Sequence, residues 1–176
     1  MFSEKKLIEE CIAGNRKAQK QLYTQYNALF FTICLRYTQT REEAEDILIT
    51  GFTSIFEALS MYKYQGSFEG WMKRIIINTA IDHYRTNRKH LLDVEIENIE
   101  NLSNGNTEIY QKLEAKEIIK KIQMMPEGYK QIFNLYAIEG YKHIEIAKLL
   151  QISESTSKSQ YAKAKKWLQI HLEDNK

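Results

Sequence analysis

Apolar residues recur at helical spacing through most of the chain, which predicts an all-α protein. A first stripe runs from Leu7 to Ile12 and ends at Gly14-Asn15, a pair typical of a helix end. Thr40 is suited to cap a later helix and has acids in the turn that follows. The stripe between these points comprises Leu22, Tyr23, Tyr26, Leu29, Phe30, Ile33 and Cys34. The helix behind the cap is expected to bury Ala44, Ile47, Leu48, Phe52, Ile55, Phe56 and Leu59.

A turn-forming run at 64–67 separates this pattern from a fourth predicted helix. Ser67 is placed to cap that helix, and its polar and apolar positions extend to about Arg88. The four helices together predict a compact N-terminal domain, residues 1–90. The apolar positions of the fourth helix are Trp71, Ile75, Ile76, Ile77 and Ala80.

Residues 91–107 differ from the sequence on either side, because they are acidic and amide-rich, lack a clean period and contain Gly105. This composition predicts a flexible, extended linker. Helical periodicity resumes at Ile109 and continues past Pro126, the only proline of the chain. The sequence therefore predicts a second small helical domain, residues 108–176.

The net charge of +2 is unevenly distributed. Residues 1–90 carry 13 basic and 10 acidic side chains, and residues 116–176 carry 11 and 7. Residues 91–115 carry one basic and six acidic side chains. Two basic ends joined by an acidic middle are typical of two modules that contact a polyanion through a linker that does not. Solvation of the surface alone also produces such patterns.

Several classes of protein are not expected. No stretch approaches the roughly 20 apolar residues of a membrane span, and the N-terminus lacks a basic-then-apolar signal, so a cytoplasmic location without membrane insertion is expected. Cys11 and Cys34 lie among apolar residues, and the histidines share no metal-ligand spacing, which predicts no metal or cofactor. Because phosphate-binding glycine loops, HExxH and nucleophile elbows are also missing, we expect no enzyme.

A helix-turn-helix is predicted between His143 and Leu168. Ala147 supplies the small residue that lets two helices cross closely, Ile152 fills the corner after the turn, and Ser153 caps the second helix. The turn itself has Gln151 where glycine is usual, since that position often needs positive φ. Glutamine adopts this conformation at modest cost, so the turn is weakened and not excluded.

The start of the second helix carries hydroxyls, an amide and lysines, which suit base edges and phosphates in the major groove. An ordinary helical hairpin with a lysine-rich solvated face is the alternative, and the combined pattern favours DNA binding. The candidate DNA-binding residues are Ser155, Thr156, Lys158, Ser159, Gln160, Lys163 and Lys166.

Over nearly its whole length the chain resembles an RNA polymerase sigma factor of the extracytoplasmic-function (ECF) group. EEAEDILITGFTSIFEAL and FEGWMKRIIINTAIDHYR resemble the second conserved region of that family. MPEGYKQIFNLYAIEGYKHIEIAKLLQISESTSKSQYAKAKKWL resembles the fourth. The resemblance implies that the N-terminal domain binds the clamp helices of core polymerase and captures the −10 promoter element. The C-terminal domain then reads the −35 element.

The resemblance places the family's acidic core-binding signature at Ala44, Glu45 and Asp46, and carboxylates on one helix face are able to pair with arginines of a partner. This sequence departs from the family two to four residues further on, where Ile49 and Thr50 replace the usual glutamine and acid. We expect the polymerase contact to be weaker or adjusted to a diverged polymerase. The candidate core-binding residues are Glu45, Asp46, Ile49 and Phe52.

In related proteins the loop corresponding to Gly66–Gly70 holds an extruded base, which needs a pocket with aromatic or polar walls. Tyr64, Phe68 and Trp71 offer aromatic walls for such a pocket. The candidate −10 residues are Phe68, Trp71, Lys73, Arg74, Asn78, Arg85 and Arg88.

Two of these residues have a structural alternative. Core packing is favoured over base stacking for Trp71. Asn78 either contacts nucleic acid or satisfies a buried backbone group, and the sequence leaves both open.

The resemblance also implies an anti-sigma partner and a linker that passes through polymerase channels, where its acids imitate a phosphodiester chain. A solvated tether is the alternative for the linker. The rival function is a helix-turn-helix transcriptional regulator whose N-terminal domain senses a ligand or dimerises without binding polymerase.

Overall fold

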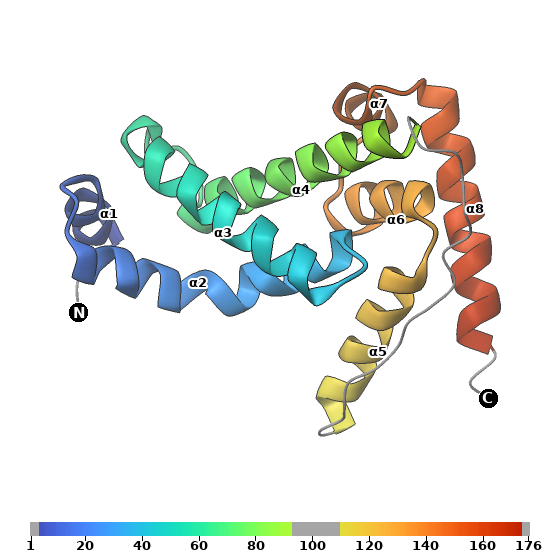
Figure 1. Ribbon diagram of the computed structural model, residues 1–176, viewed down its shortest axis with the longest axis horizontal. Helices are drawn as coiled ribbons and strands as arrows, with labels where there is room; N and C mark the ends of the chain where they lie inside the picture. The colour runs from blue at the N-terminus through green and yellow to red at the C-terminus, as the bar shows by residue number, and fades with distance from the viewer. Residues whose placement is uncertain (1–3, 93–109, 174–176) are drawn as a thin grey trace. The chain divides into compact units, whose positions relative to one another are not determined.

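The computed structural model describes residues 4–92 and 110–173, with side chains at 4–87 and 117–171. Over these ranges the chain is helical with no strand, as the sequence predicts. Most of the predicted linker and the side chains of Arg88 and Lys89 lie outside the described residues. The helices are α1 (Glu4–Ile12), α2 (Arg16–Tyr37), α3 (Arg41–Ala58), η1 (Leu59–Met61), α4 (Phe68–Leu92), α5 (Tyr110–Met124), α6 (Glu127–Phe133), η2 (Asn134–Ile138), α7 (His143–Leu150) and α8 (Glu154–Glu173) (Figure 1).

The contacts divide the chain into two compact units, residues 1–82 and 83–176. In the first unit α2 and α3 lie side by side and α1 packs on α2 (Figure 1). Phe30 at the centre of α2 is fully buried and contacts the ring of Phe52 on α3, with ring centroids 5.8 Å apart. The predicted apolar stripes therefore form this core, except that Ile12, Tyr23 and Leu29 are exposed and Phe56 is half-buried.

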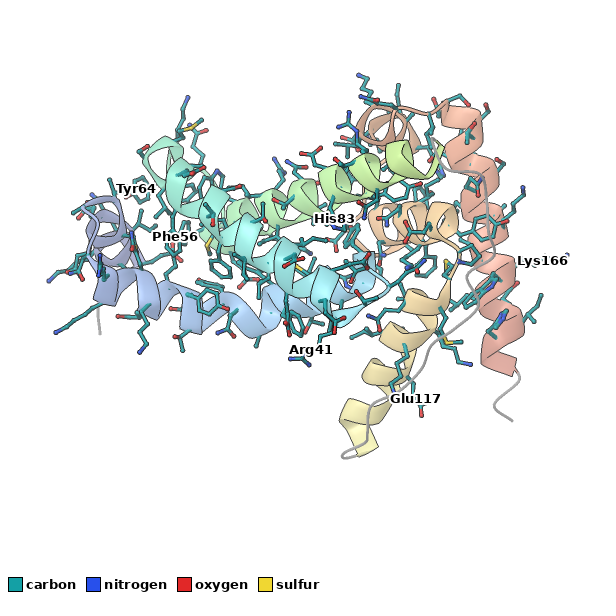
Figure 2. The ribbon with its side chains drawn as sticks, viewed as in Figure 1. Arg41, Phe56, Tyr64, His83, Glu117 and Lys166 are labelled. Carbon is teal, nitrogen blue, oxygen red and sulfur yellow. The ribbon has the colours of Figure 1, made fainter. Side chains whose placement is uncertain are left out.

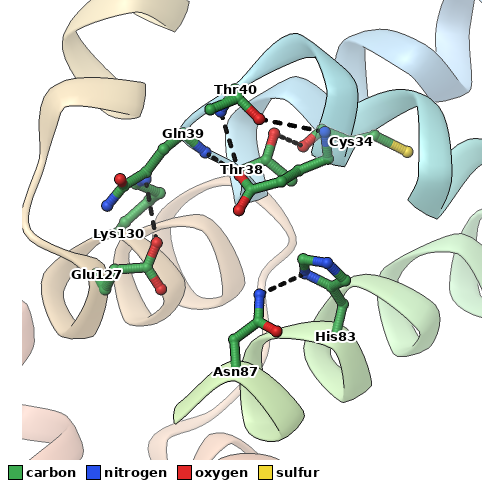
Figure 3. A network of polar contacts seen from close by, with 9 residues as sticks. Cys34, Thr38, Gln39, Thr40, His83, Asn87, Glu127 and Lys130 are labelled. Carbon is green, nitrogen blue, oxygen red and sulfur yellow. Dashed lines mark hydrogen bonds and ion pairs between the residues drawn. The ribbon is translucent and has the colours of Figure 1, made fainter. Parts of the chain in front are cut away.

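The helix starts of the first unit follow from their capping residues. Asn15 Oδ1 accepts hydrogen bonds from the backbone N–H of Lys17 at 2.9 Å and of Ala18 at 3.3 Å. Thr40 and Glu43 form a reciprocal capping box at α3, with bonds of 3.2 and 3.1 Å (Figure 3). Such a cap stabilises a helix by about 1 kcal/mol. The cap predicted at Thr40 is confirmed.

Gly51 marks the close approach of α3 to α4. A Cβ added at Gly51 would lie 2.5 Å from Cδ1 of Ile76, a fully buried residue of α4. A larger residue at the position that follows Ile49 and Thr50 would thus have to displace the end of the Ile76 side chain.

The second unit contains the predicted helix-turn-helix, in which α7 leads into α8 (Figure 1). Gln151 lies in the left-handed region at φ 54° and ψ 48°, as the turn demands. The backbone N–H of Ile152 then donates to the carbonyl of Ala147 at 3.0 Å. Ser153 Oγ accepts from the N–H of Thr156 at 3.0 Å, so the predicted cap of α8 is confirmed.

The two helices of the motif are also joined by a polar bond on their buried side. Ser157 of α8 is fully buried, and its hydroxyl lies 2.9 Å from Nδ1 of His143, the first residue of α7. The ring of Tyr136 stacks on His143 at 4.2 Å between centroids. This cluster orients α8 against α7 and leaves the opposite face of α8 free of these contacts.

Candidate nucleic-acid and partner interfaces

One face of α8 is exposed along its length, and it carries most of the candidate DNA-binding residues. Helical spacing puts residues three and four apart on one face, and the buried Ser157 and Ala164 mark the opposite side. Lys166 points away from the unit (Figure 2). The exposed face contains Ser155, Lys158, Ser159, Ala162, Lys163 and Lys166.

Two candidates on α8 are placed differently. Thr156 is half-buried, and its Oγ1 lies 2.7 Å from Ser153 Oγ, so this hydroxyl supports the cap. The Oε1 of Gln160 is buried and would lie 3.8 Å from a Cβ added at Gly128 of α6. Gln160 therefore directs its acceptor toward α6 and away from the exposed face.

Lys158 is held by an acid one turn earlier on α8. Its Nζ lies 2.6 Å from Oε1 of Glu154, and the two side chains are 61% and 44% exposed. The hydrogen bond from Lys158 and its positive charge lower the pKa of Glu154. The start of α8 therefore presents an ionised carboxylate and an ammonium group side by side.

A second cationic surface lies on α4. Trp71, Arg74, Asn78 and Arg85 are spaced three, four and seven residues apart, which puts them on one helix face. Asn78 is exposed, so the structure disfavours the alternative that it satisfies a buried backbone group. Lys73 lies about 100° around the helix from Arg74, because each residue advances by that angle.

The aromatic residues beside this face are part of a packed cluster. Phe68 is only 1% exposed and contacts Tyr62 at 5.1 Å and Trp71 at 5.9 Å between ring centroids. Trp71 is half-buried in this cluster, which agrees with the favoured packing role. Phe68 was predicted to contact the −10 element, but its ring is packed inside this aromatic cluster and is too deeply buried to stack on a base.

The loop between η1 and α4 is closed by two residues in the left-handed region, Tyr64 at φ 56° and Gly66 at φ 83°. The hydroxyl of Tyr62 donates to the carbonyl of Gly66 at 2.9 Å. Tyr64 remains largely exposed, and the Nζ of Lys5 on α1 lies 6.0 Å from its ring centroid. Sequence reasoning missed Tyr62 and Lys5, because their roles depend on how the loop folds back on α1.

A groove of about 520 Å³ lies between α2 and α3. Arg41 on its edge is fixed twice: Nε donates to Oε1 of Glu45 at 2.7 Å, and the guanidinium lies 5.1 Å from the ring of Phe31. Ile49 is 60% exposed on the same groove. The lining residues are Tyr23, Asn27, Ala28, Phe31, Arg41, Glu45, Leu48 and Ile49.

The groove joins two of the candidate core-binding residues, Glu45 and Ile49, and Asp46 is exposed on the same helix. Phe52 does not belong to this surface, because it is 3% exposed and packs against Tyr23 at 4.7 Å between centroids. The contribution of α2 to the groove was missed. The sequence did hold a sign of this contribution: the apolar stripe of α2 includes more positions than one buried helix face requires.

The described residues show little sign of other chemistry. Among them, no group of three His, Cys, Asp or Glu side chains could hold a metal ion. None of the helices within residues 4–92 and 110–173 is long and apolar enough to cross a membrane. Cys11 and Cys34 are free and buried, and burial raises the pKa of Cys34 to about 12, which keeps it an unreactive thiol.

Two family models match the chain in the order of its two helical units. The model of sigma-70 region 2 matches residues 22–90, and the model of sigma-70 region 4 matches residues 115–168.

Curated relatives match over 81% to 97% of their lengths. The ECF RNA polymerase sigma factor SigW of Bacillus subtilis is 24% identical and covers 97% of both chains. The RNA polymerase sigma-H factor of Pseudomonas aeruginosa is 25% identical over 92% of this chain and 90% of its own. The ECF RNA polymerase sigma factor SigM of Mycobacterium tuberculosis is 21% identical over 93% of this chain and 81% of its own.

Two solved structures share the fold. CnrH, solved in complex with the cytosolic domain of CnrY, is 19% identical with a TM-score of 0.51 and covers 97% of both chains. RpoE, solved with the anti-sigma factor NepR from Bartonella quintana, is 16% identical with a TM-score of 0.59. The second match covers 89% of this chain and 98% of that one.

Proposed function

The chain is an RNA polymerase sigma factor of the sigma-70 family, in its ECF group, and on that premise we propose how its surfaces divide the work of promoter recognition. The N-terminal domain, residues 1–90, binds core polymerase and the −10 element. The C-terminal domain, residues 108–176, reads the −35 element through α8. Residues 91–107 link the two. The region 2 and region 4 matches at 22–90 and 115–168 fall inside these boundaries and support them.

Core polymerase binds the groove between α2 and α3. The observation that carries this assignment is the exposed Ile49 beside the Arg41–Glu45 ion pair, on a helix that also exposes Asp46. An apolar centre with a polar rim is the composition of protein interfaces that must hold a partner. Because Arg41 is held by Glu45 and Phe31, it offers its remaining N–H donors to a partner carboxylate without much further ordering.

The −10 element lies along the face of α4 that carries Trp71, Arg74, Asn78 and Arg85. Lys73 contacts the DNA phosphate backbone beside that face. Phosphates of a single strand are attracted to such a cationic stripe. The exposed ring of Tyr64, at the loop, is the aromatic surface available to an unstacked base.

The −35 element lies against the exposed face of α8. Lys163 and Lys166 contact phosphates, while Ser155 and Ser159 approach the base edges. The chain works in the cytoplasm as an initiation factor. It catalyses no reaction itself, because polymerase performs the RNA synthesis. We also propose an anti-sigma protein as a regulatory partner, and the complexes of CnrH and RpoE support this.

A mobility-shift experiment separates this function from a regulator that acts without polymerase. The full chain is mixed with promoter duplexes, with and without core polymerase. The proposal predicts a specific complex only when core polymerase is present, because each DNA-binding module alone has a small footprint. Specific binding of equal affinity without core polymerase would support the independent regulator.

A further inference from the structure

The start of α8 carries an ion pair whose chemistry differs from the other lysines of the exposed face. Glu154 and Lys158 are joined at 2.6 Å, and both remain substantially exposed. Lys163 and Lys166 lie later on the helix, where they have no acid one turn earlier, since Ser159 and Ala162 occupy those positions. The pair is therefore the only place from 154 to 166 where a donor and an acceptor of opposite charge are presented together.

The rest of the exposed face is poorly equipped to distinguish bases. Bidentate readers of base edges are arginine or lysine for guanine, and asparagine or glutamine for adenine. The segment from 154 to 166 contains no arginine or asparagine, and Gln160 directs its Oε1 toward α6. The hydroxyl of Ser159 donates to the carbonyl of Thr156 at 3.0 Å, and that of Ser155 lies 2.8 Å from Ser153 Oγ. A hydroxyl serves as donor or acceptor, so neither serine selects one base pair. Lys163 and Lys166 are assigned to phosphates in the proposed function, so discrimination by α8 then depends on Lys158 and its partner Glu154.

We infer that Glu154 and Lys158 act as one unit that reads a G·C base pair in the promoter duplex, which rests on the proposed binding of α8 to the major groove. Lys158 donates to N7 and O6 of guanine, and Glu154 accepts from N4 of cytosine. The ammonium group has three N–H donors, so one remains on Glu154 while two are available to the guanine.

The pattern of groups in the major groove favours G·C over A·T for this pair. A G·C pair presents two adjacent acceptors and then a donor, which matches two N–H donors beside a carboxylate. An A·T pair puts the N6 amino group of adenine next to N7, so the ammonium loses one acceptor and faces a donor. A glutamate carboxylate is ionised at neutral pH and acts only as an acceptor, and Lys158 lowers the pKa of Glu154 further.

The alternative role of the Glu154–Lys158 ion pair is purely structural: an i, i+4 pair that only stabilises the helix. Such a pair would influence stability and overall affinity, but it would leave the preference among bases unchanged. Base preference, and not affinity, is therefore the quantity to measure.

The test uses holoenzyme made from core polymerase and the full chain, on promoter duplexes randomised across the −35 region. Initiation is measured for each sequence with the wild type, Glu154→Gln, Lys158→Ala and the double variant. We expect the wild type to favour G·C at one base pair by about tenfold, the effect of one good base contact. Each single variant should reduce that preference to within about twofold and leave other base pairs unchanged, and the double variant should reduce it no further.

Lys163→Ala is the matched control, because it removes a lysine of the same face that lacks a carboxylate partner. It should lower initiation across all duplexes and keep the G·C preference. Wild-type preference retained in both single variants would overturn the inference, as would an equal loss on every duplex like that of Lys163→Ala. A wild-type holoenzyme that initiates on no duplex would instead refute the proposed function. Circular dichroism of each variant verifies that α8 still forms.

Discussion

The hydroxyl of the buried Ser157 lies 2.9 Å from Nδ1 of the half-buried His143, so a polar bond joins the two helices of the helix-turn-helix. The bond holds the buried side of α8, and the residues on the opposite side are the ones left for DNA. This bond and the packing of α8 on α6 and α7 therefore fix which face of α8 is exposed.

Replacing Ser157 with alanine should destabilise the C-terminal unit by about 1 kcal/mol, since the partly buried hydrogen bond to His143 is lost. Chemical denaturation followed by circular dichroism measures the change. Ser159→Ala removes a hydroxyl from the exposed face of the same helix and should change stability by less than about 0.5 kcal/mol. Equal effects of the two variants would show that the bond to His143 contributes nothing.

Gln151→Gly should stabilise the same unit by up to about 1 kcal/mol, because glycine adopts the left-handed conformation of Gln151 without strain. Gln169→Gly is the matched control at an exposed position of α8, where glycine should cost about 1 kcal/mol. The two substitutions are chemically identical and are expected to have opposite signs in thermal unfolding. A loss of stability in Gln151→Gly would contradict the strained turn.

Ile49→Gln should weaken binding to core polymerase about tenfold, because it removes an exposed apolar side chain from the lining of the groove. Thr50→Gln, at the neighbouring exposed position, is the control and should change the affinity by less than about twofold. Asp46→Lys should also weaken binding while the helical fold stays intact.

Ionic strength separates the two kinds of contact. The loss caused by Ile49→Gln should be independent of salt, whereas the loss caused by Asp46→Lys should shrink as salt screens the charge. Titration of the labelled chain with core polymerase at two salt concentrations measures the loss of affinity for each variant. Unchanged affinity in Ile49→Gln would remove the groove from the polymerase interface.

Arg74→Ala should reduce strand opening at the −10 element more than Lys73→Ala does, although the two cations are adjacent in sequence. Only Arg74 shares a helix face with Trp71 and Asn78. Fluorescence of 2-aminopurine placed in the −10 element reports opening by the holoenzyme. A larger loss in Lys73→Ala would mean that DNA follows another face of α4.

Periodicity and capping chemistry predicted the helices, the caps at Thr40 and Ser153, and the left-handed Gln151, because each depends on residues close in sequence. The sequence could not separate core aromatic residues from surface ones. Phe52 and Phe68 were expected at interfaces, but both are buried among rings that other helices supply. An aromatic residue on an amphipathic helix gives the same pattern in either role.

The remaining differences also come from tertiary packing. The groove needs Phe31 of α2 and Arg41 of α3 to meet, and no local pattern predicts their contact. Gln160 occupies the flank of α8, where its side chain could face DNA or α6, and only the packing against Gly128 decides between them.

The central claim is that one chain carries polymerase to promoter DNA through two separate helical units. Transcription in vitro tests it most directly, with core polymerase, the purified full chain and a library of bacterial promoter duplexes. The account predicts discrete transcripts from a subset of templates that depend on adding the chain. Failure to initiate on every template, in a preparation that a known sigma factor activates, would contradict it.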